Sequence, residues 1–316
     1  MTVRLGPRPL RIGALIWPQH TTWPALMEAG ARADALGFDD LWVWDHLLPI
    51  QGHPSGPIYE PFMTLAGWAS ATTQARLGPM VAANTFRNPA LLVKMITTLD
   101  HMTAGRAILG IGAGWFEDEH RAFGLDFGAG TGERLDRLDE AAAFLRDVLD
   151  GRTASARGPH YSMAGFVNDP RPIQPALPLL IGGSGERKTL ATVARYADVW
   201  NTGGEIEELR HKDAVLREWC ERVGRDQACI ERSVGIPPLV IRDTVASARR
   251  LARRLSLANP GWDGPSLMGP PSAIVDHIAP YVELGFRTIH VDIPAPFDVE
   301  TMERFAEEVR PALERS

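Results

Sequence analysis

The chain has little cysteine and no long hydrophobic run. Cys220 and Cys229 are the only cysteines among 316 residues, and they suggest neither a metal site nor the disulfide framework of a secreted protein. No apolar stretch is long enough to span a membrane, and Met1–Arg11 lacks the apolar core of a signal peptide. These absences predict a cytoplasmic protein with no bound metal and no membrane partner.

An excess of one charge is also missing. The formal net charge is −6 at pH 7, and the 33 basic and 39 acidic residues are dispersed along the chain. Four arginines between residues 249 and 254 alternate with apolar residues, which is typical of the solvated face of a helix. Nucleic acid is therefore not predicted as a partner.

The chain does show a regular alternation of short apolar runs with amphipathic segments. Eight runs are apolar at nearly every residue and most are bounded by Gly, Pro or Asn, which is the pattern of parallel strands buried on both faces. The predicted strands are Arg11–Trp17, Asp40–Asp45, Leu77–Ala83, Ala107–Gly112, Leu179–Gly183, Val199–Asn201, Val234–Ile241 and Thr288–Ile293. The predicted helices are Pro24–Leu36, a helix capped by Asn88 and Pro89, Gly132–Leu149, Glu186–Tyr196, Ile206–Val223, Val245–Leu255, Ser272–Leu284 and Val299–Leu313.

This alternation leaves two α/β topologies, a closed barrel and an open doubly wound sheet. The count of eight strands favours the barrel, as does the lack of a nucleotide-binding glycine turn after the first strand. We therefore predict a single (β/α)₈ TIM-barrel domain over residues 1–316. Gly151–Pro178 and Ala258–Pro271 break the rhythm and are predicted to be loop insertions.

Two glycine motifs follow predicted strands. The motif GIGAGW at 110–115 resembles a dinucleotide fingerprint, but its final glycine is missing and no helix is predicted directly after it. The motif GGSGE at 182–186 is not a nucleophile elbow, because Glu186 stands where that turn needs glycine. It precedes a predicted helix and suits a phosphate group, although a tight turn with no ligand is equally compatible with it.

Side chains at the ends of predicted strands are candidates for chemistry. His46 follows Asp45 at the end of the second strand, on the catalytic face of a barrel, where histidine can exchange a proton near neutral pH. A histidine of this kind can instead only hydrogen-bond a loop. Trp17, Trp44 and Trp115 lie at or near strand ends and suit a flat, largely apolar ligand, with rim packing as the alternative.

The eighth predicted strand carries two more polar residues. His290 and Asp292 lie late in Thr288–Ile293, where a side chain could point into the barrel or toward a ligand. A buried pair with satisfied hydrogen bonds explains them at least as well, so neither is included in the predicted site.

Four blocks of sequence occur in an order that resembles one known superfamily. They read LGFDDLWVWDH at 36–46, NTFRNPALL at 84–92, LDHMTAGR at 99–106 followed by GIGAGW, and LIGGSGER at 180–187 followed by ADVWN at 197–201. Together they resemble the luciferase-like monooxygenase superfamily, and particularly its branch that uses the deazaflavin coenzyme F420. The likeness covers the first two-thirds of the chain.

The resemblance implies a (β/α)₈ barrel, often in a homodimer, with the cofactor at the carboxyl end of the strands. It implies a non-proline cis peptide near Met80–Val81, under the middle ring of the cofactor. His46 corresponds to the active-site histidine, and Asp45 to the acidic residue near the pyrimidine edge of the ring. The other residues that it places beside the cofactor are Ala82, Ala83, Ala113, Gly114, Gly182, Gly183, Ser184 and Gly185, the last four near its phosphate-bearing tail.

The chain departs from the sugar-phosphate dehydrogenases of this superfamily at two positions. Trp115 stands where those enzymes have a glutamate, and Ile50 replaces a tryptophan. Oxidation of a sugar phosphate is therefore not expected.

The resulting prediction is an F420-dependent oxidoreductase that transfers a hydride to or from a flat, largely apolar small molecule, with His46 as proton donor or acceptor. The alternative is an FMN-dependent monooxygenase supplied with reduced flavin by a separate reductase. A third possibility is a barrel that binds flavin or deazaflavin without turnover.

Overall fold

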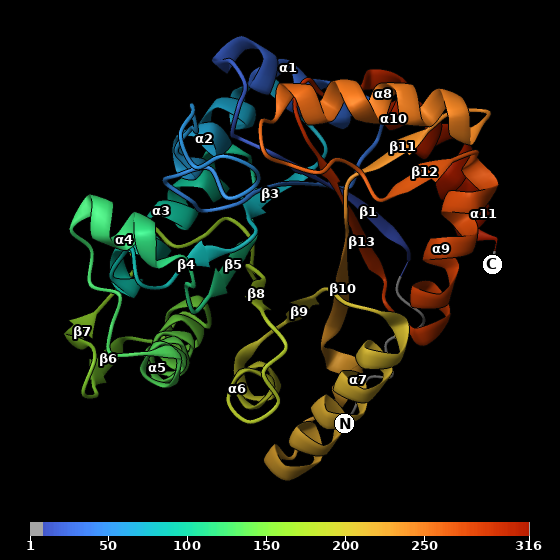
Figure 1. Ribbon diagram of the computed structural model, residues 1–316. Coiled ribbons are helices and arrows are strands. Elements are labelled where there is room, and N and C mark those ends of the chain that lie inside the picture. The colour runs from blue at the N-terminus through green and yellow to red at the C-terminus, as the bar shows by residue number, and fades with distance from the viewer. Residues whose placement is uncertain (1–8, 316) are drawn as a thin grey trace. The chain divides into compact units, whose positions relative to one another are not determined.

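The computed structural model describes residues 9–315 (Figure 1). These residues divide into two compact units. The central unit is Leu77–Glu231, and the terminal unit combines residues 9–76 with residues 232–315. The single domain expected over 1–316 stays a prediction, and its residues 1–8 and 316 lie outside the described residues. No helix within residues 9–315 is long and apolar enough to cross a membrane.

The terminal unit is built on parallel strands in the order β2-β1-β13-β10. These strands are β1 (Arg11–Ile16), β2 (Asp40–Val43), β10 (Glu231–Ile236) and β13 (Thr288–Ile293). Leu15 of β1 pairs with Trp42 of β2 on one side and with Asp292 of β13 on the other. The carboxyl ends of β2, β1 and β13 therefore lie side by side.

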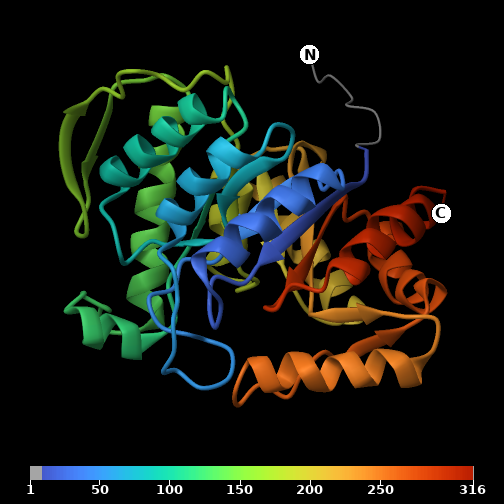
Figure 2. The same cartoon turned by 90° about the horizontal axis from the view of Figure 1, so that it is seen from above.

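The helices of the terminal unit mostly follow the prediction. They are α1 (Trp23–Ala35), α2 (Pro61–Ala71), α8 (Val245–Ala258), α9 (Pro271–Leu284), α10 (Val299–Arg304), a π-helical turn at Phe305–Val309 and α11 (Arg310–Glu314). Helix α8 packs against a small parallel sheet of β11 (Leu239–Ile241) and β12 (Leu267–Gly269) (Figure 2).

The central unit repeats the parallel arrangement with strands in the order β4-β5-β8-β9. Its strands are β3 (Arg76–Pro79, which starts one residue before the unit), β4 (Ala82–Ala83), β5 (Leu109–Gly112), β8 (Leu179–Gly182), β9 (Val199–Thr202) and the antiparallel hairpin of β6 (Ala154–Arg157) and β7 (Ser162–Phe166). Its helices are α3 (Pro89–Met102), α4 (Glu117–Phe123), α5 (Thr131–Leu149), α6 (Thr189–Tyr196), α7 (Ile206–Val223) and a short 3₁₀ turn at Gln227–Cys229. The hairpin lies beside α5 (Figures 1 and 2).

Helix α3 shows how the local sequence sets an element. The side chain of Asn88 accepts a hydrogen bond from the amide of Ala90 at 2.9 Å, and Pro89 occupies the first helical position, as predicted. The helix buries one face that includes Leu92, Ile96 and Leu99. The capping residues fix where the helix begins, and the buried stripe fixes its orientation.

Several predicted boundaries are wrong. The run Val234–Ile241 forms two strands in different sheets, because Pro237 and Pro238 separate β10 from β11 and offer no amide hydrogen for a ladder. The run Leu77–Ala83 likewise divides into β3 and β4. The helix predicted from Glu186 begins at Thr189, after a turn at residues 186–188.

Some elements were not predicted at all. Helix α2 begins at Pro61, where the side chain of Glu60 accepts a hydrogen bond from the amide of Met63 at 2.7 Å. Helix α4 begins two residues after Trp115, so the expectation that no helix directly follows GIGAGW is wrong. The two predicted loop insertions contain the β6–β7 hairpin and β12.

Candidate active site

The terminal unit brings most of its predicted site residues to one edge of its sheet. Trp17 follows β1, and Trp44, Asp45 and His46 follow β2. All four are buried, with 0% of Trp17, 5% of Trp44, 1% of Asp45 and 9% of His46 exposed. The rings of Trp44 and His46 are 6.4 Å apart, centroid to centroid. This edge therefore holds the histidine and the carboxylate among aromatic side chains.

Trp17 is the centre of the aromatic cluster at this edge. Its ring lies 5.0 Å from that of Trp44 and 5.0 Å from that of Trp262. Its indole Nε1 donates a hydrogen bond to Oδ2 of Asp292 at 3.2 Å. Trp17 has no exposed surface and packs against its aromatic neighbours, and its place in a substrate pocket stays a prediction.

His290 and Asp292 do not form the mutual pair that the sequence suggested. Nδ1 of His290 lies 3.2 Å from the hydroxyl of Ser233, whereas Asp292 accepts from Trp17. Burial lowers the pKa of His290 to about 3, so the imidazole is neutral across the physiological range. Burial raises the pKa of the Asp292 carboxyl to about 7, and the hydrogen bond from Trp17 opposes that rise. Asp292 therefore has a pKa close to neutral pH, although it was not included in the site predicted from the sequence.

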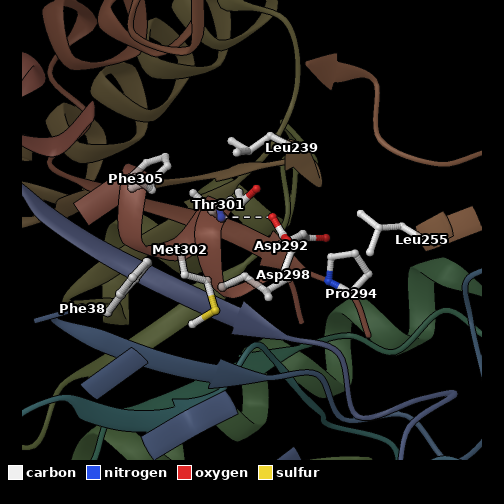
Figure 3. Close-up of a pocket in the computed structure, with 11 residues that line it drawn as sticks. Phe38, Leu239, Leu255, Asp292, Pro294, Asp298, Thr301, Met302 and Phe305 are labelled. Atoms are coloured by element: carbon white, nitrogen blue, oxygen red, sulfur yellow. Dashed lines mark hydrogen bonds between the residues drawn. The ribbon is translucent and has the colours of Figure 1, made fainter. Parts of the chain in front are cut away.

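A cavity in the terminal unit has Asp292, Asp298 and Thr301 among its lining residues (Figure 3). It is lined mainly by apolar side chains, namely Phe38, Leu239, Leu255, Val291, Ile293, Pro294, Met302 and Phe305. The polar side chain of Asp298 at its wall accepts from Arg242 at 2.8 and 2.9 Å and from the amide of Thr301 at 3.0 Å. A cavity of about 20 Å³ has room for roughly one water molecule, so it is a packing void and not a ligand pocket.

In the central unit, the backbone at the ends of β5 and β8 approaches the side chain of Val81 closely. The peptide bond between Met80 and Val81 is cis, which confirms the sequence prediction. A Cβ atom on Gly112 would lie 2.6 Å from Cγ2 of Val81, and one on Gly182 would lie 3.1 Å from both Val81 methyl groups. Only glycine lets these two strand ends approach Val81 so closely. Ala82 and Ala83 form β4 and pair with Ile111 and Gly112.

Gly114 is held by a set of buried polar side chains. Its φ is +77°, and a Cβ atom there would lie 2.6 Å from Oγ1 of Thr85. Nε of Arg134 donates to the carbonyl of Gly114 at 3.1 Å, and the guanidinium lies 3.8 Å above the ring of Phe127. The backbone beside Ala113 is therefore fixed from one side by a buried cation.

His120, the buried histidine of α4, supports the same segment. Its Nδ1 lies 2.7 Å from the carbonyl oxygen of Phe116, and its Nε2 lies 2.7 Å from Oγ1 of Thr85. A carbonyl oxygen can only accept, so Nδ1 carries a proton and donates to Phe116. Trp115 is 62% exposed, with its ring 5.3 Å from that of Phe116, and its contact with an apolar ligand stays a prediction.

The segment Gly182–Gly185 leaves β8 with backbone groups available. The amide of Gly183 donates to the carbonyl of Asn201 at 2.9 Å, and Nε1 of Trp200 donates to the carbonyl of Gly183 at 2.8 Å. Within residues 9–315, the amides of Ser184 and Gly185 donate no hydrogen bond to the protein. Consecutive free amides before a helix can bind an anion.

Glu186 would repel an anion there, but its charge is compensated. Its carboxylate accepts from Lys212 at 2.7 Å and lies 3.2 Å from Nε2 of His211. The hydrogen bond from Lys212 is the main reason that the pKa of Glu186 is lowered. Among the described residues, no three His, Cys, Asp or Glu side chains are grouped as a metal ion would require.

Comparison with known proteins places these features in a family context. A family model described as luciferase-like monooxygenase matches residues 10–262. An F420-dependent glucose-6-phosphate dehydrogenase of Kineococcus radiotolerans is 30% identical over 237 residues, which cover 72% of this chain and 68% of that protein.

Two solved structures share the fold at low sequence identity. An F420-dependent secondary alcohol dehydrogenase in complex with an F420-acetone adduct has a TM-score of 0.82 and 20% identity, over 97% of this chain and 99% of the other. The oxygenating constituent of 3,6-diketocamphane monooxygenase from Pseudomonas putida, in complex with FMN, has a TM-score of 0.73 and 19% identity, over 96% and 98%. The likeness confirms the predicted (β/α)₈ fold class of the luciferase-like type.

Proposed function

The chain belongs to the luciferase-like monooxygenase family, and from that premise we propose that it is an F420-dependent oxidoreductase. Its substrate would be a flat, largely apolar small molecule that gains or loses a hydride. The relatives named above include F420-dependent enzymes and an FMN-containing monooxygenase, so the cofactor is what distinguishes this proposal from its alternative.

One observation carries the proposal. After β8, the amides of Ser184 and Gly185 donate no hydrogen bond within residues 9–315. At the end of the same strand, Gly182 lies directly against the side chain of Val81. Free amides suit a phosphate-bearing tail, and a wall made of backbone and one aliphatic side chain suits the face of a flat ring. The residues of the central unit thus fit a phosphorylated flavin or deazaflavin.

The roles of the central-unit residues follow from this fit. Gly182, Gly183, Ser184 and Gly185 would hold the phosphate through backbone N–H groups, and Met80, Val81, Ala82 and Ala83 would support the ring, with Ala113 and Gly114 beside it. When bound, the deazaflavin supplies a hydride at its central carbon. The protein's contribution is to orient that carbon and to keep water away from it.

The terminal unit would supply the polar chemistry. In this proposal Asp45 lies near the pyrimidine edge of the ring, and His46 gives or takes the proton that accompanies the hydride. Trp44 and Trp115 would select a flat, apolar substrate, with Trp17 supporting Trp44 from behind. Trp115 and Ile50 also make sugar-phosphate oxidation an unexpected activity, even though one relative carries it out.

The second candidate is an FMN-dependent monooxygenase, favoured by the structural likeness to an FMN-containing oxygenase. The same backbone cradle would hold FMN, and a separate reductase would supply the reduced flavin. Reduced flavin reacts with oxygen, whereas a deazaflavin does not readily do so. The two candidates therefore predict opposite results in an oxygen-uptake assay.

The deciding experiment is a titration of the purified apoprotein with F420 and, separately, with FMN, followed by quenching of tryptophan fluorescence. The chain has nine tryptophans, several of them near the predicted site residues. We expect tight F420 binding and weak FMN binding. The reverse preference, together with oxygen uptake on addition of reduced FMN, would replace the proposal by its alternative. Binding of neither would reject both.

A further inference from the structure

Asp292 lies at the same edge of the terminal-unit sheet as His46. It is the fifth residue of β13, directly opposite Leu15 of β1 and thus next to the strand that ends at Trp17. Leu15 also pairs with Trp42 of β2, the strand that leads to Asp45 and His46. The three adjacent strands β2, β1 and β13 therefore carry His46, Trp17 and Asp292 at or near their carboxyl ends.

The surroundings of the Asp292 carboxyl are unusual for a structural aspartate. Its neighbours along the strand, Val291 and Ile293, are 4% and 8% exposed, whereas Asp292 keeps part of its surface accessible. Oδ2 accepts the hydrogen bond from Trp17, and within residues 9–315 no other group donates to the carboxyl and no cation pairs with it. Carboxylates in apolar surroundings are normally paired or multiply hydrogen-bonded.

Neighbouring charges are not the cause of the raised pKa of Asp292. The ionisable groups on the surrounding elements are His290 on β13, Asp45 and His46 after β2, Asp263 beside Trp262, and Asp298, which is paired with Arg242. His290 is uncharged above pH 3, and the two causes that act on the pKa of Asp292 are burial and the Trp17 hydrogen bond. The carboxyl is held partly protonated near pH 7 by desolvation alone, as in other enzymes that use a carboxylic acid as proton donor.

We propose that Asp292 is a catalytic acid–base residue that exchanges a proton with the oxygen of a carbonyl substrate. This inference rests on the proposed function, because it needs a hydride donor of the deazaflavin class. It also narrows the substrate to a compound with a reducible carbonyl group, or to the corresponding alcohol.

The step balances in atoms and electrons. With reduced deazaflavin bound, the carbonyl carbon would accept its hydride, and the π electron pair of the C=O bond would move to oxygen. The O–H bond of Asp292 breaks as the new O–H bond of the alcohol forms, which leaves Asp292 as a carboxylate. His46 would then return a proton to Asp292, and solvent would take up the proton that the oxidised deazaflavin releases. In the reverse direction the carboxylate removes the alcohol proton.

The first test needs neither cofactor nor substrate. In apoprotein labelled with ¹⁵N-tryptophan, the indole N–H signal of Trp17, assigned with Trp17→Phe, reports the charge on Asp292. We expect this signal to titrate with a midpoint near pH 7 and to be independent of pH in Asp292→Asn. The asparagine keeps an acceptor oxygen for Trp17, so the fold is retained. A signal that does not move between pH 5 and pH 9 in the wild-type protein overturns the proposal.

The second test is reduction of benzaldehyde, a flat and largely apolar carbonyl compound, by reduced F420. We expect kcat/KM of the wild type to fall as the pH rises above about 7, because the acid is then ionised. Asp292→Asn should lose about 10²- to 10⁴-fold in kcat/KM below pH 7 and should lose this pH limb, with F420 affinity changed by less than about threefold. Asp263→Asn, an exposed carboxyl beside Trp262, is the matched control and should behave as wild type.

The outcomes separate the two proposals. If F420 does not bind, the proposed function fails, and with it the catalytic role of Asp292, while the indole titration still reports whether the carboxyl has the expected pKa. If F420 binds but benzaldehyde is not reduced, or Asp292→Asn reduces it like the wild type, the role of Asp292 is overturned and the proposed function survives.

Discussion

The strand ends of the two units carry different kinds of chemistry. In the central unit they present glycine backbone, with Gly112 and Gly182 closing on Val81 and free amides at Ser184 and Gly185. In the terminal unit they present side chains that titrate or stack, including His46, Trp44 and Asp292. Under the proposed function, backbone groups of the central unit would bind the cofactor and side chains of the terminal unit would move protons.

The largest expected effect is on His46. His46→Ala should lower benzaldehyde reduction by reduced F420 about 10²- to 10⁴-fold, because a positioned proton donor is lost, while the F420 affinity stays within about threefold. His277→Ala, an exposed histidine on α9, is the matched control and should keep full activity. Steady-state kinetics and fluorescence titration measure the two quantities. Unchanged turnover with intact F420 binding would remove His46 from the proposed chemistry.

The next effect is on the backbone of the central unit. Gly112→Ala places a methyl group against the stiff side chain of Val81, so the free energy of unfolding should fall by about 1–3 kcal/mol and F420 affinity should fall with it. Gly132→Ala, in the first turn of α5, would meet only Nζ of the flexible Lys188 side chain, at 4.0 Å, and should be neutral or stabilising by up to about 1 kcal/mol. Denaturant unfolding and fluorescence titration compare them. Equal behaviour of the two variants would show that the close approach to Val81 is dispensable.

A smaller effect concerns the pH dependence of stability in the terminal unit. The folded pKa of His290, about 3, lies below its ordinary value of 6.5, so between these values the unfolded chain binds the extra proton and stability rises with pH. The folded pKa of Asp292, about 7, lies above its ordinary value of 3.8, so between those values the folded chain binds the extra proton and stability falls as pH rises. In the wild type the two slopes oppose each other between pH 3.8 and 6.5.

Substituting Asp292 or His290 alone should reveal the pH dependence of stability that the other residue causes. Asp292→Asn should leave a free energy of unfolding that rises between pH 5 and pH 6.5, by at most about 1.4 kcal/mol per pH unit. His290→Gln should leave one that falls over the same window. Denaturant titrations at several pH values measure both. Slopes of the same sign in the two variants would mean that burial does not shift these groups in opposite directions.

The smallest effect is expected at Ser184. Among the described residues its hydroxyl makes no hydrogen bond, and its proposed role is carried by the backbone amide, so Ser184→Ala should change the F420 affinity by less than about threefold. The fluorescence titration used for the wild type gives the answer. A loss of tenfold or more would mean that the central unit also binds through side chains, and the contrast between the units would weaken.

Sequence reasoning recovered most of the elements because their signals are local. Continuous apolar runs predicted the parallel strands, and Asn88 with Pro89 predicted where α3 begins. The cis peptide at Met80–Val81 was predicted from the family resemblance and is confirmed. Local signals failed where a strand is interrupted, as at Pro237 and Pro238, and at α2 and α4, which the sequence analysis did not predict.

The amino-acid sequence was enough to predict the fold class, the order of most elements and the strand-end positions of His46 and the glycine motifs. The groups with shifted pKa values became visible only in the folded chain, because a pKa depends on burial and on partners distant in sequence. Asp292 and Trp17 are 275 positions apart, and their hydrogen bond exists because β1 and β13 are neighbours in the sheet. In the folded chain Asp292 accepts a hydrogen bond from Trp17, whereas His290 lies within hydrogen-bond distance of Ser233. The spacing of these residues along the chain does not reveal which partner each one has.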